Sequence, residues 1–346
     1  MPPMTDSFLS SKSAVAVLIG VFLLCLVSLT LSCLPGHAGI APRDVLAAFA
    51  TPLGVGAVSP ETSLVVLHIR LSRACIALLC GGALATAGVA LQGVLRNPLA
   101  DPFTLGISAG AACGASIAIA FGAPLAFALG VSGASLISGG ALFGALLALG
   151  GALWLGRGGG FSREGVILGG IAVAAFLGAV VALVKALNEE SVTSIVFWIM
   201  GSLQGRGWDA LPLLLATVLP GLCCVACCWR ALDVLGLGDE QAAQTGLAVG
   251  RIRLLLLLGA SGMTAGCVAV TGVIGFVGLV APHILRLWLG VGHGPLLIGA
   301  FFGGGLLLLW ADVAARSLLG GGMELPVGVV TALLGGPFFA FLVRRR

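Results

Sequence analysis

The stretch IALLCGGALATAGVALQGVLRNPLADP, residues 76–102, decides the fold class of this chain. Residues 76–95 are almost entirely Ala, Leu, Val and Gly, in a continuous apolar run without the alternation of a half-buried strand. Residues 96–102 then bring an arginine, an asparagine, an aspartate and two prolines into one short segment. Because proline ends helices, an apolar helix of the kind that lies in lipid stops here. The polar segment at residues 96–102 is either a connecting loop or part of a functional surface.

Composition extends this conclusion to the whole chain. Of its 346 residues, 59% are hydrophobic and only 9% are charged, which is too few charges for the surface of a water-soluble domain. Apolar runs long enough to cross a bilayer core of roughly 30 Å as helices follow one another with short polar breaks. The sequence predicts an all-α integral membrane protein, a single domain over residues 1–346, with ten transmembrane helices at 14–34, 70–94, 103–122, 133–156, 165–186, 210–229, 254–272, 274–290, 296–312 and 325–343.

The basic residues orient these spans. If the N-terminus is cytoplasmic, eleven basic residues fall on the cytoplasmic side: Lys12, Arg96, Arg157, Arg163, Arg230, Arg251, Arg253, Arg286 and residues 344–346. The opposite side carries six: Arg43, Arg70, Arg73, Lys185, Arg206 and Arg316. The excess predicts that both termini are cytoplasmic. The six basic residues on the outer side need a separate explanation.

The first apolar run has two interpretations. It follows Lys12 and ends near Leu31-Ser32-Cys33, which is similar to a lipoprotein cleavage site. Because the run is long and further spans follow it, we favour an uncleaved first transmembrane helix over a signal peptide.

The ten cysteines do not indicate a disulfide framework, because nearly all lie inside apolar runs. Four of them have a helical spacing that could hold zinc, but no histidine or acidic residue is near them; they are Cys223, Cys224, Cys227 and Cys228. We favour packing for these side chains, and we expect neither a metal site nor a cofactor.

Motifs of other chemistries are weak. The two lysines, Lys12 and Lys185, lie outside any G-x-x-x-x-G-K-[ST] phosphate loop, so ATP would have to be hydrolysed by a partner. Ser108 lies in a G-x-S-x-G match, but none of the four histidines has an obvious route to it, and we favour close helix packing over a hydrolase. The middle of the spans is nearly free of charge, so ion-coupled transport has no evident carrier. We expect no catalytic residue.

Fifty-five glycines indicate a compact bundle, because small residues let helix backbones approach closely. Residues 86–89 also recur in part at 264–267, in two helices that the predicted topology runs in opposite directions. This is a weak indication of an inverted repeat.

The most polar internal segment lies at residues 231–250, between two spans. Its apolar residues recur at helical spacing, and its polar positions include Asp239, Glu240, Gln241 and Gln244. A solvated loop is one interpretation. We favour a short cytoplasmic helix that is offered to a partner protein.

Several motifs, in order along residues 70–343, resemble the FecCD-type permease subunits of ABC importers for ferric siderophores, haem and cobalamin. They are Arg70-Leu71-Ser72-Arg73, Gly88 with Gln92, Arg96 to Pro102 with Leu105-Gly106, Trp198 to Leu203, Leu235 to Gly246, Gly275 to Leu279 with Pro282-His283 and Arg286, Ala311-Asp312 with Arg316, and Leu325 to Gly328. No single motif decides the matter, but the ordered set is specific.

The resemblance implies a type II ABC importer permease fold and a multi-pass protein of the bacterial inner membrane. It implies a homodimer around one translocation path, two cytoplasmic ATPase subunits and a periplasmic substrate-binding protein, with no nucleic-acid partner. The chain would be a transport subunit and not an enzyme. The cargo would be an iron chelate, first a ferric siderophore, with haem or cobalamin as alternatives. A secondary, ion-coupled transporter without an ATPase partner is the other interpretation.

The resemblance also implies roles for particular residues. Asn97 and Leu99 would form part of the cytoplasmic gate, where Leu99 can close a narrow pore and Asn97 can satisfy exposed backbone. The ATPase coupling residues would be Leu235, Gly238, Asp239, Glu240, Ala242 and Gly246, with polar contacts from Asp239 and Glu240. The outer arginines Arg70, Arg73 and Arg316 would pair with glutamates of the binding protein, because a guanidinium binds a carboxylate in a bidentate manner. The alternative is that these arginines are ordinary interfacial anchors. The chain departs from the family at Gly294-Pro295 and near Ser162, and it has no tyrosine.

Overall fold

The computed structural model describes residues 11–36, 39–51, 58–157, 162–319 and 321–344, and within these ranges the chain is helical, without strands. Arg345 and Arg346, which belong to the predicted cytoplasmic charge, lie outside the described residues. The predicted all-α fold is confirmed.

Seven helices of the described ranges are long and apolar enough to cross a membrane. They are α1 (Ser11–Ser32), α4 (Leu71–Leu95), α7 (Gly133–Gly156), α8 (Arg163–Leu187), α10 (Leu211–Cys227), α13 (Val249–Thr271) and α15 (His293–Ser317). An eighth candidate is the pair α5 (Ile107–Phe121) and α6 (Ala123–Leu129), which is bent by 83°. Two shorter apolar helices are α14 (Val277–Leu289) and α16 (Val327–Arg344). Each predicted span overlaps one of these elements, but ten complete crossings remain a prediction.

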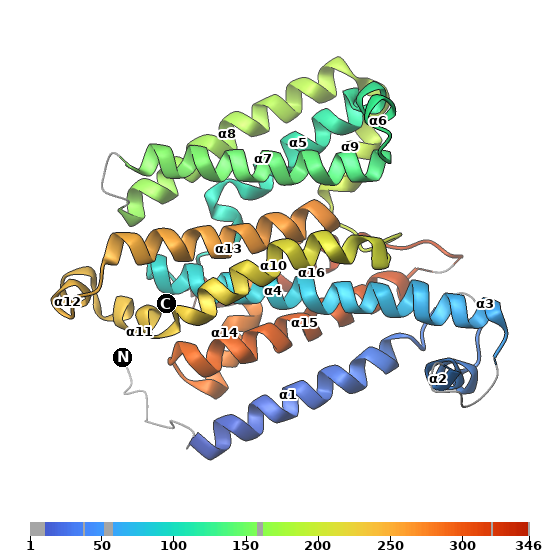
Figure 1. Ribbon diagram of the computed structural model, residues 1–346, viewed down its shortest axis with the longest axis horizontal. Helices are drawn as coiled ribbons and strands as arrows, with labels where there is room; N and C mark the ends of the chain where they lie inside the picture. The colour runs from blue at the N-terminus through green and yellow to red at the C-terminus, as the bar shows by residue number, and fades with distance from the viewer. Residues whose placement is uncertain (1–10, 37–38, 52–57, 158–161, 320, 345–346) are drawn as a thin grey trace.

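The helices are arranged in layers (Figure 1). The helices α5, α7 and α8 pack together at one edge, and α4, α10 and α13 lie in the middle. Beyond them α15 packs against both α4 and α14, and α1 lies outermost against α15. Short elements connect α8 to α10; they are η5 (Glu189–Ser191), α9 (Val192–Ile199) and η6 (Trp208–Ala210).

The central helix α4 is the most deeply buried of the seven long spans, and glycine explains how its neighbours come so close. A Cβ atom added at Gly88 would lie 1.9 Å from the carbonyl oxygen of Gly278 in α14, and one at Gly81 would lie 2.3 Å from that of Gly304 in α15. Only glycine allows this backbone contact. The small residues predicted to mark helix interfaces therefore do so here.

The two ends of the bundle differ. The start of α1 and the short helices α11 (Trp229–Leu237) and α12 (Asp239–Gln244) lie at one end, and the mark for the C-terminus lies there too (Figure 1). The helices α2 (Pro42–Ala50) and α3 (Pro60–Ser63) lie at the other end, where η2 (Leu64–Arg70), a π-helical turn, leads into α4. This arrangement agrees with both termini being on the side of the 231–250 segment.

Candidate functional site

The segment after α4 is a tightly capped turn. Leu95 ends the helix, and Arg96 adopts a left-handed conformation with φ 48°. The N–H of Asn97 donates to the carbonyl oxygen of Gln92 at 3.1 Å, and the Oδ1 of Asn97 accepts from the N–H of Leu99 at 3.0 Å. Asn97 is exposed and Leu99 is half-buried. The asparagine therefore satisfies exposed backbone, as expected from its type, and leaves the Leu99 side chain at the surface of the bundle end.

Asp101 closes this turn and begins the next one. Its carboxylate accepts from the N–H of Phe103 at 2.9 Å and so caps the short helix η3 (Pro102–Leu105). Burial raises the pKa of the Asp101 carboxyl to about 6, and the hydrogen bond from Phe103 opposes that rise.

Five of the six residues predicted to couple the chain to an ATPase divide into a buried group and an exposed group. Leu235, Gly238 and Ala242 are buried within the chain, whereas Glu240 and Gly246 are exposed. Gly238 has φ 129°, which favours glycine, and it separates α11 from α12. Only the exposed group can meet another protein directly without rearrangement. Leu237, Gln241 and Gln244 lie on the same exposed surface.

The carboxylate of Asp239 forms two ion pairs within the chain. Its Oδ1 accepts from Arg163, the first residue of α8, and its Oδ2 accepts from the Nη2 of Arg253 in α13 at 2.7 Å. Burial alone would raise the pKa of the Asp239 carboxyl, but the hydrogen bonds and charges of Arg253 and Arg163 lower it below its usual range. The carboxylate therefore holds two cations at neutral pH.

The three outer arginines are buried, with exposed fractions of 5% for Arg70, 8% for Arg73 and 7% for Arg316. Arg73 donates to both oxygens of Asp312 and, at 2.8 Å, to Glu324. The Nε of Arg316 lies 3.7 Å from Asp312, one helical turn away. Two of the predicted docking residues therefore share one buried carboxylate.

Backbone carbonyl oxygens accept hydrogen bonds from the Nη groups of Arg70 and Arg316. The Nη1 of Arg70 donates to Cys33 at 2.7 Å and to Leu34 at 3.2 Å, and Arg316 donates to Ser32 and Pro35. The C-terminal end of α1 is thus tied to α4 and α15. In these contacts the arginines anchor the chain to itself.

A smaller polar bridge joins α4 to α14. The side chain of Gln92 donates to the carbonyl oxygen of Gly278 at 3.2 Å and accepts from the Nη2 of Arg286 at 3.1 Å. Gln92 and Arg286 belong to motifs that the sequence analysis identified. The bridge lies one turn before the Asn97 segment and satisfies a buried amide.

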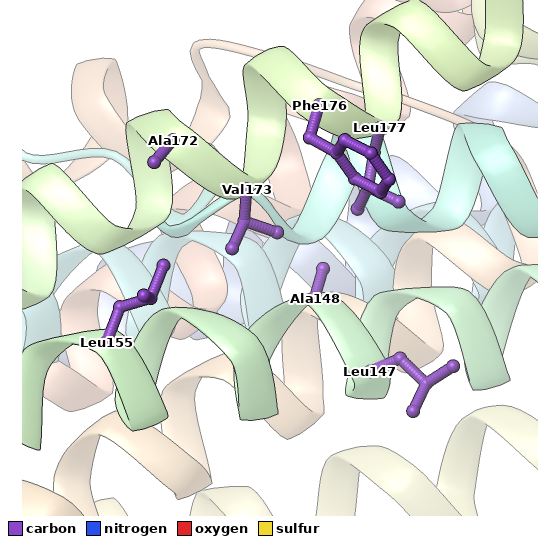
Figure 2. Close-up of a pocket in the computed structure, with 7 residues that line it drawn as sticks. All are labelled: Leu147, Ala148, Leu155, Ala172, Val173, Phe176 and Leu177. Atoms are coloured by element: carbon purple, nitrogen blue, oxygen red, sulfur yellow. The ribbon is translucent and has the colours of Figure 1, made fainter.

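A shallow apolar pocket of about 310 Å³ lies between α7 and α8 (Figure 2). Its seven lining residues are aliphatic or aromatic: Leu147, Ala148, Leu155, Ala172, Val173, Phe176 and Leu177. It offers no polar group that would hold a ligand in one orientation. In the described residues, no three His, Cys, Asp or Glu side chains gather as a metal site requires.

The cation partners of Asp239 and the acidic partners of Arg73 were missed from the sequence. The i, i+4 spacing of Asp312 and Arg316 is a signal that could have indicated one of these pairs. Asp239 and Arg163 are separated by 76 positions in the sequence, and Arg73 and Asp312 by 239 positions. No local sequence pattern therefore indicates these two pairs.

A bundle of helices that are long and apolar enough to cross a membrane defines a multi-pass membrane protein. The chain belongs to the FecCD transport family, whose model matches residues 23–345. The predicted family is confirmed.

Known proteins place the chain further. It is 40% identical over 283 residues to the hemin transport system permease protein HmuU of Yersinia pestis, covering 81% of this chain and 83% of that protein. It is 36% identical over 329 residues to the ferric enterobactin transport system permease protein FepD of Escherichia coli, covering 94% of each. A solved structure of a metal-chelate type ABC transporter in an inward-facing conformation matches with a TM-score of 0.82 at 28% identity, over 96% of this chain and 99% of that one. The permease fold and the multi-pass location in the inner membrane follow from the family.

Proposed function

We propose that this chain is the membrane-spanning subunit of an ATP-driven importer that moves an iron chelate into the cytoplasm. Ferric siderophore is the first candidate, and haem and cobalamin are the alternatives. The observation that carries the proposal is the family match over nearly the whole chain, together with relatives named for haem and ferric enterobactin transport. The nearly charge-free interior supports a conduit that does not hold its cargo tightly.

ATP would be hydrolysed by two partner subunits that bind the exposed part of the 231–250 segment. Glu240 and Gly246 are exposed, and the helices α11 and α12 of this segment lie at one end of the bundle (Figure 1). The same end would face the cytoplasm. Asn97 and Leu99 would act at the inner gate, because the capped turn presents Leu99 on a rigid backbone.

Two copies of this chain would enclose the path, and a periplasmic binding protein would dock at the end that carries α2 and α3. Arg70, Arg73 and Arg316 lie beneath that end. Because their guanidinium groups are buried and paired within the chain, a docking role would require them to act through the field they create or after a local rearrangement.

The test is to purify the chain from its native membrane in mild detergent and to determine the masses and peptide sequences of everything that comes with it. We expect two copies with two ATPase subunits. A complex without an ATPase would contradict the proposal and would favour ion-gradient-driven transport. Binding of ferric siderophore, haem and cobalamin to the co-purified or genetically adjacent binding protein would then decide among the cargoes.

A further inference from the structure

Asp239 begins α12, the short helix that the proposed function places against the ATPase, yet its carboxylate pairs with two arginines of its own chain. The helix has only six residues and packs mainly on α11 and α13. The link from α12 to α8 is the pair between Asp239 and Arg163. A helix of six residues is not stable by itself, so the position of α12 depends on its contacts with the rest of the chain.

The two cations that hold Asp239 are themselves anchored. The Arg253 side chain is 5% exposed and the Arg163 side chain 20% exposed, compared with 44% for Asp239. Arg253 lies in the first turns of α13, and Arg163 is the first residue of α8. A bridge to one buried and one partly buried arginine has fewer possible geometries than an exposed pair of long side chains.

From α8 the contacts continue to the gate segment. A Cβ atom added at Gly170 in α8 would lie 2.6 Å from the carbonyl oxygen of Thr104 and 2.8 Å from the Cα of Leu105. Thr104 and Leu105 belong to η3, which Asp101 caps directly after the Asn97 turn. At Gly170 the backbone of α8 lies directly against the backbone of η3, so a shift of α8 at this point is passed to η3.

A second contact reaches the same place from the other side. The Nη1 of Arg96, next to Asn97, would lie 3.6 Å from a Cβ atom added at Gly238, the residue before Asp239. The Arg96 end of the proposed gate segment therefore lies next to the start of α12. The other end is connected to the start of α12 through η3, α8 and Arg163.

We propose that Asp239 is a positioning residue for transport: its bridge to Arg163 and Arg253 carries the displacement of α12 to the Asn97–Leu99 gate segment. This inference rests on the proposed function. It assigns Asp239 to force transfer within the chain and leaves contact with the ATPase to Glu240 and its exposed neighbours.

The experiment uses the complete complex reconstituted in liposomes. Leu99→Cys is introduced with the exposed Cys223 and Cys227 replaced by serine, and the rate of labelling at position 99 by a small maleimide is measured with and without ATP. This reports movement at the gate segment without requiring the cargo to be known. ATP hydrolysis, retention of the ATPase subunits and the unfolding temperature are measured on the same samples.

For Asp239→Asn, which keeps the size but removes the charge, we expect the ATP-dependent change in labelling to shrink by roughly fivefold or more, the scale of a typical coupling between sites. ATP hydrolysis and retention of the ATPase should stay at the values of the parent protein. The unfolding temperature should fall, because the buried Arg253 loses a charged partner, and Asp239→Glu should restore both the unfolding temperature and the labelling change. The matched control is Glu240→Gln, one residue along and exposed, which should reduce retention of the ATPase instead.

An unchanged response to ATP in Asp239→Asn would overturn the proposal. Loss of the ATPase subunits from that variant would also overturn it, because Asp239 would then be a docking contact. If Asp239→Asn does not fold, Arg163→Gln answers the same question, since it leaves the bridge to Arg253 in place and removes only the route to α8. A parent complex without an ATPase would remove the proposed function itself, and this outcome is seen before any variant is made.

Discussion

Asp312 neutralises two buried arginines at one end of the bundle. It is 1% exposed and accepts from Arg73, and it lies within 3.7 Å of Arg316. Removing one partner of a buried ion pair leaves an uncompensated charge, so Asp312→Ala should lower the free energy of unfolding by about 3–5 kcal/mol. The measurement is thermal unfolding in detergent.

Glu324→Gln is the control for Asp312→Ala. It removes a partly exposed carboxylate that makes a single contact with Arg73, so a smaller loss is expected. Equal stability of Asp312→Ala and the parent protein would show that the arginines do not depend on this carboxylate.

Asp101 makes the free energy of unfolding depend on pH. Its pKa in the folded chain is about 6, above the usual value for aspartate, so the folded state binds more protons than the unfolded state between roughly pH 4 and 6. The stability that comes from this group is present in acid and is lost as the pH rises through 6. Asp101→Asn can still cap η3, so it should keep the fold and flatten this part of the profile. Unfolding temperatures of both proteins at pH 5 and pH 7.5 check this. A parallel profile for the two proteins would contradict it.

At the level of single helices, the crossing of α4 and α14 depends on one missing side chain. A methyl group at Gly88 would meet the carbonyl oxygen of Gly278 at 1.9 Å, so Gly88→Ala must push the two helices apart. We expect a loss of about 1–3 kcal/mol, as for other overpacked cores.

The matched control for Gly88→Ala is Gly139→Ala in α7. Nothing lies within 4 Å of the added Cβ there, and alanine favours a helix. Thermal unfolding of the two variants separates packing from helix propensity. If both lose the same stability, close contact between α4 and α14 is not what requires glycine at position 88.

How much of each element could be predicted depended on whether its signal is local. The apolar runs were found because a helix that crosses lipid needs about 20 consecutive apolar residues, and any such run shows itself. The bend between α5 and α6 was not predicted, since Gly122 and Pro124 were two among many breaks in a chain rich in glycine. Asp239 was expected to contact the ATPase, because the family resemblance implies that role for its segment. Its partners come from α8 and α13, and only the folded chain brings them to it.

At the scale of the whole molecule, the outer arginines should affect docking and stability separately. Arg70 donates only to backbone carbonyl oxygens of the α1 end in the contacts described, so Arg70→Gln should remove a charge with less damage than a change at Arg73. If docking uses this charge, the affinity for the binding protein should fall by roughly tenfold or less, and more steeply at low salt, since charge steers association.

The control for Arg70→Gln is Arg43→Gln, whose side chain is exposed and pairs only with its neighbour Asp44 in the contacts that the structure shows. Surface-immobilised binding protein and the detergent-solubilised complex give both affinities. An unchanged affinity for Arg70→Gln, with a normal unfolding temperature, would remove Arg70 from the docking residues.

The helix α4 has a consequence for communication along the molecule. It starts beside Arg70 and Arg73, with Arg73 anchored to Asp312, and it ends at Arg96 and the Asn97 turn. Its 25 residues extend for about 38 Å at 1.5 Å per residue, close to the thickness of a bilayer with its headgroups. A helix clamped by glycine contacts such as those at Gly81 and Gly88 bends little, so a tilt at one end of α4 would also displace the other end. In the proposed importer, docking of the binding protein at the Arg70 end of α4 could then shift the gate segment at its Asn97 end through the helix itself.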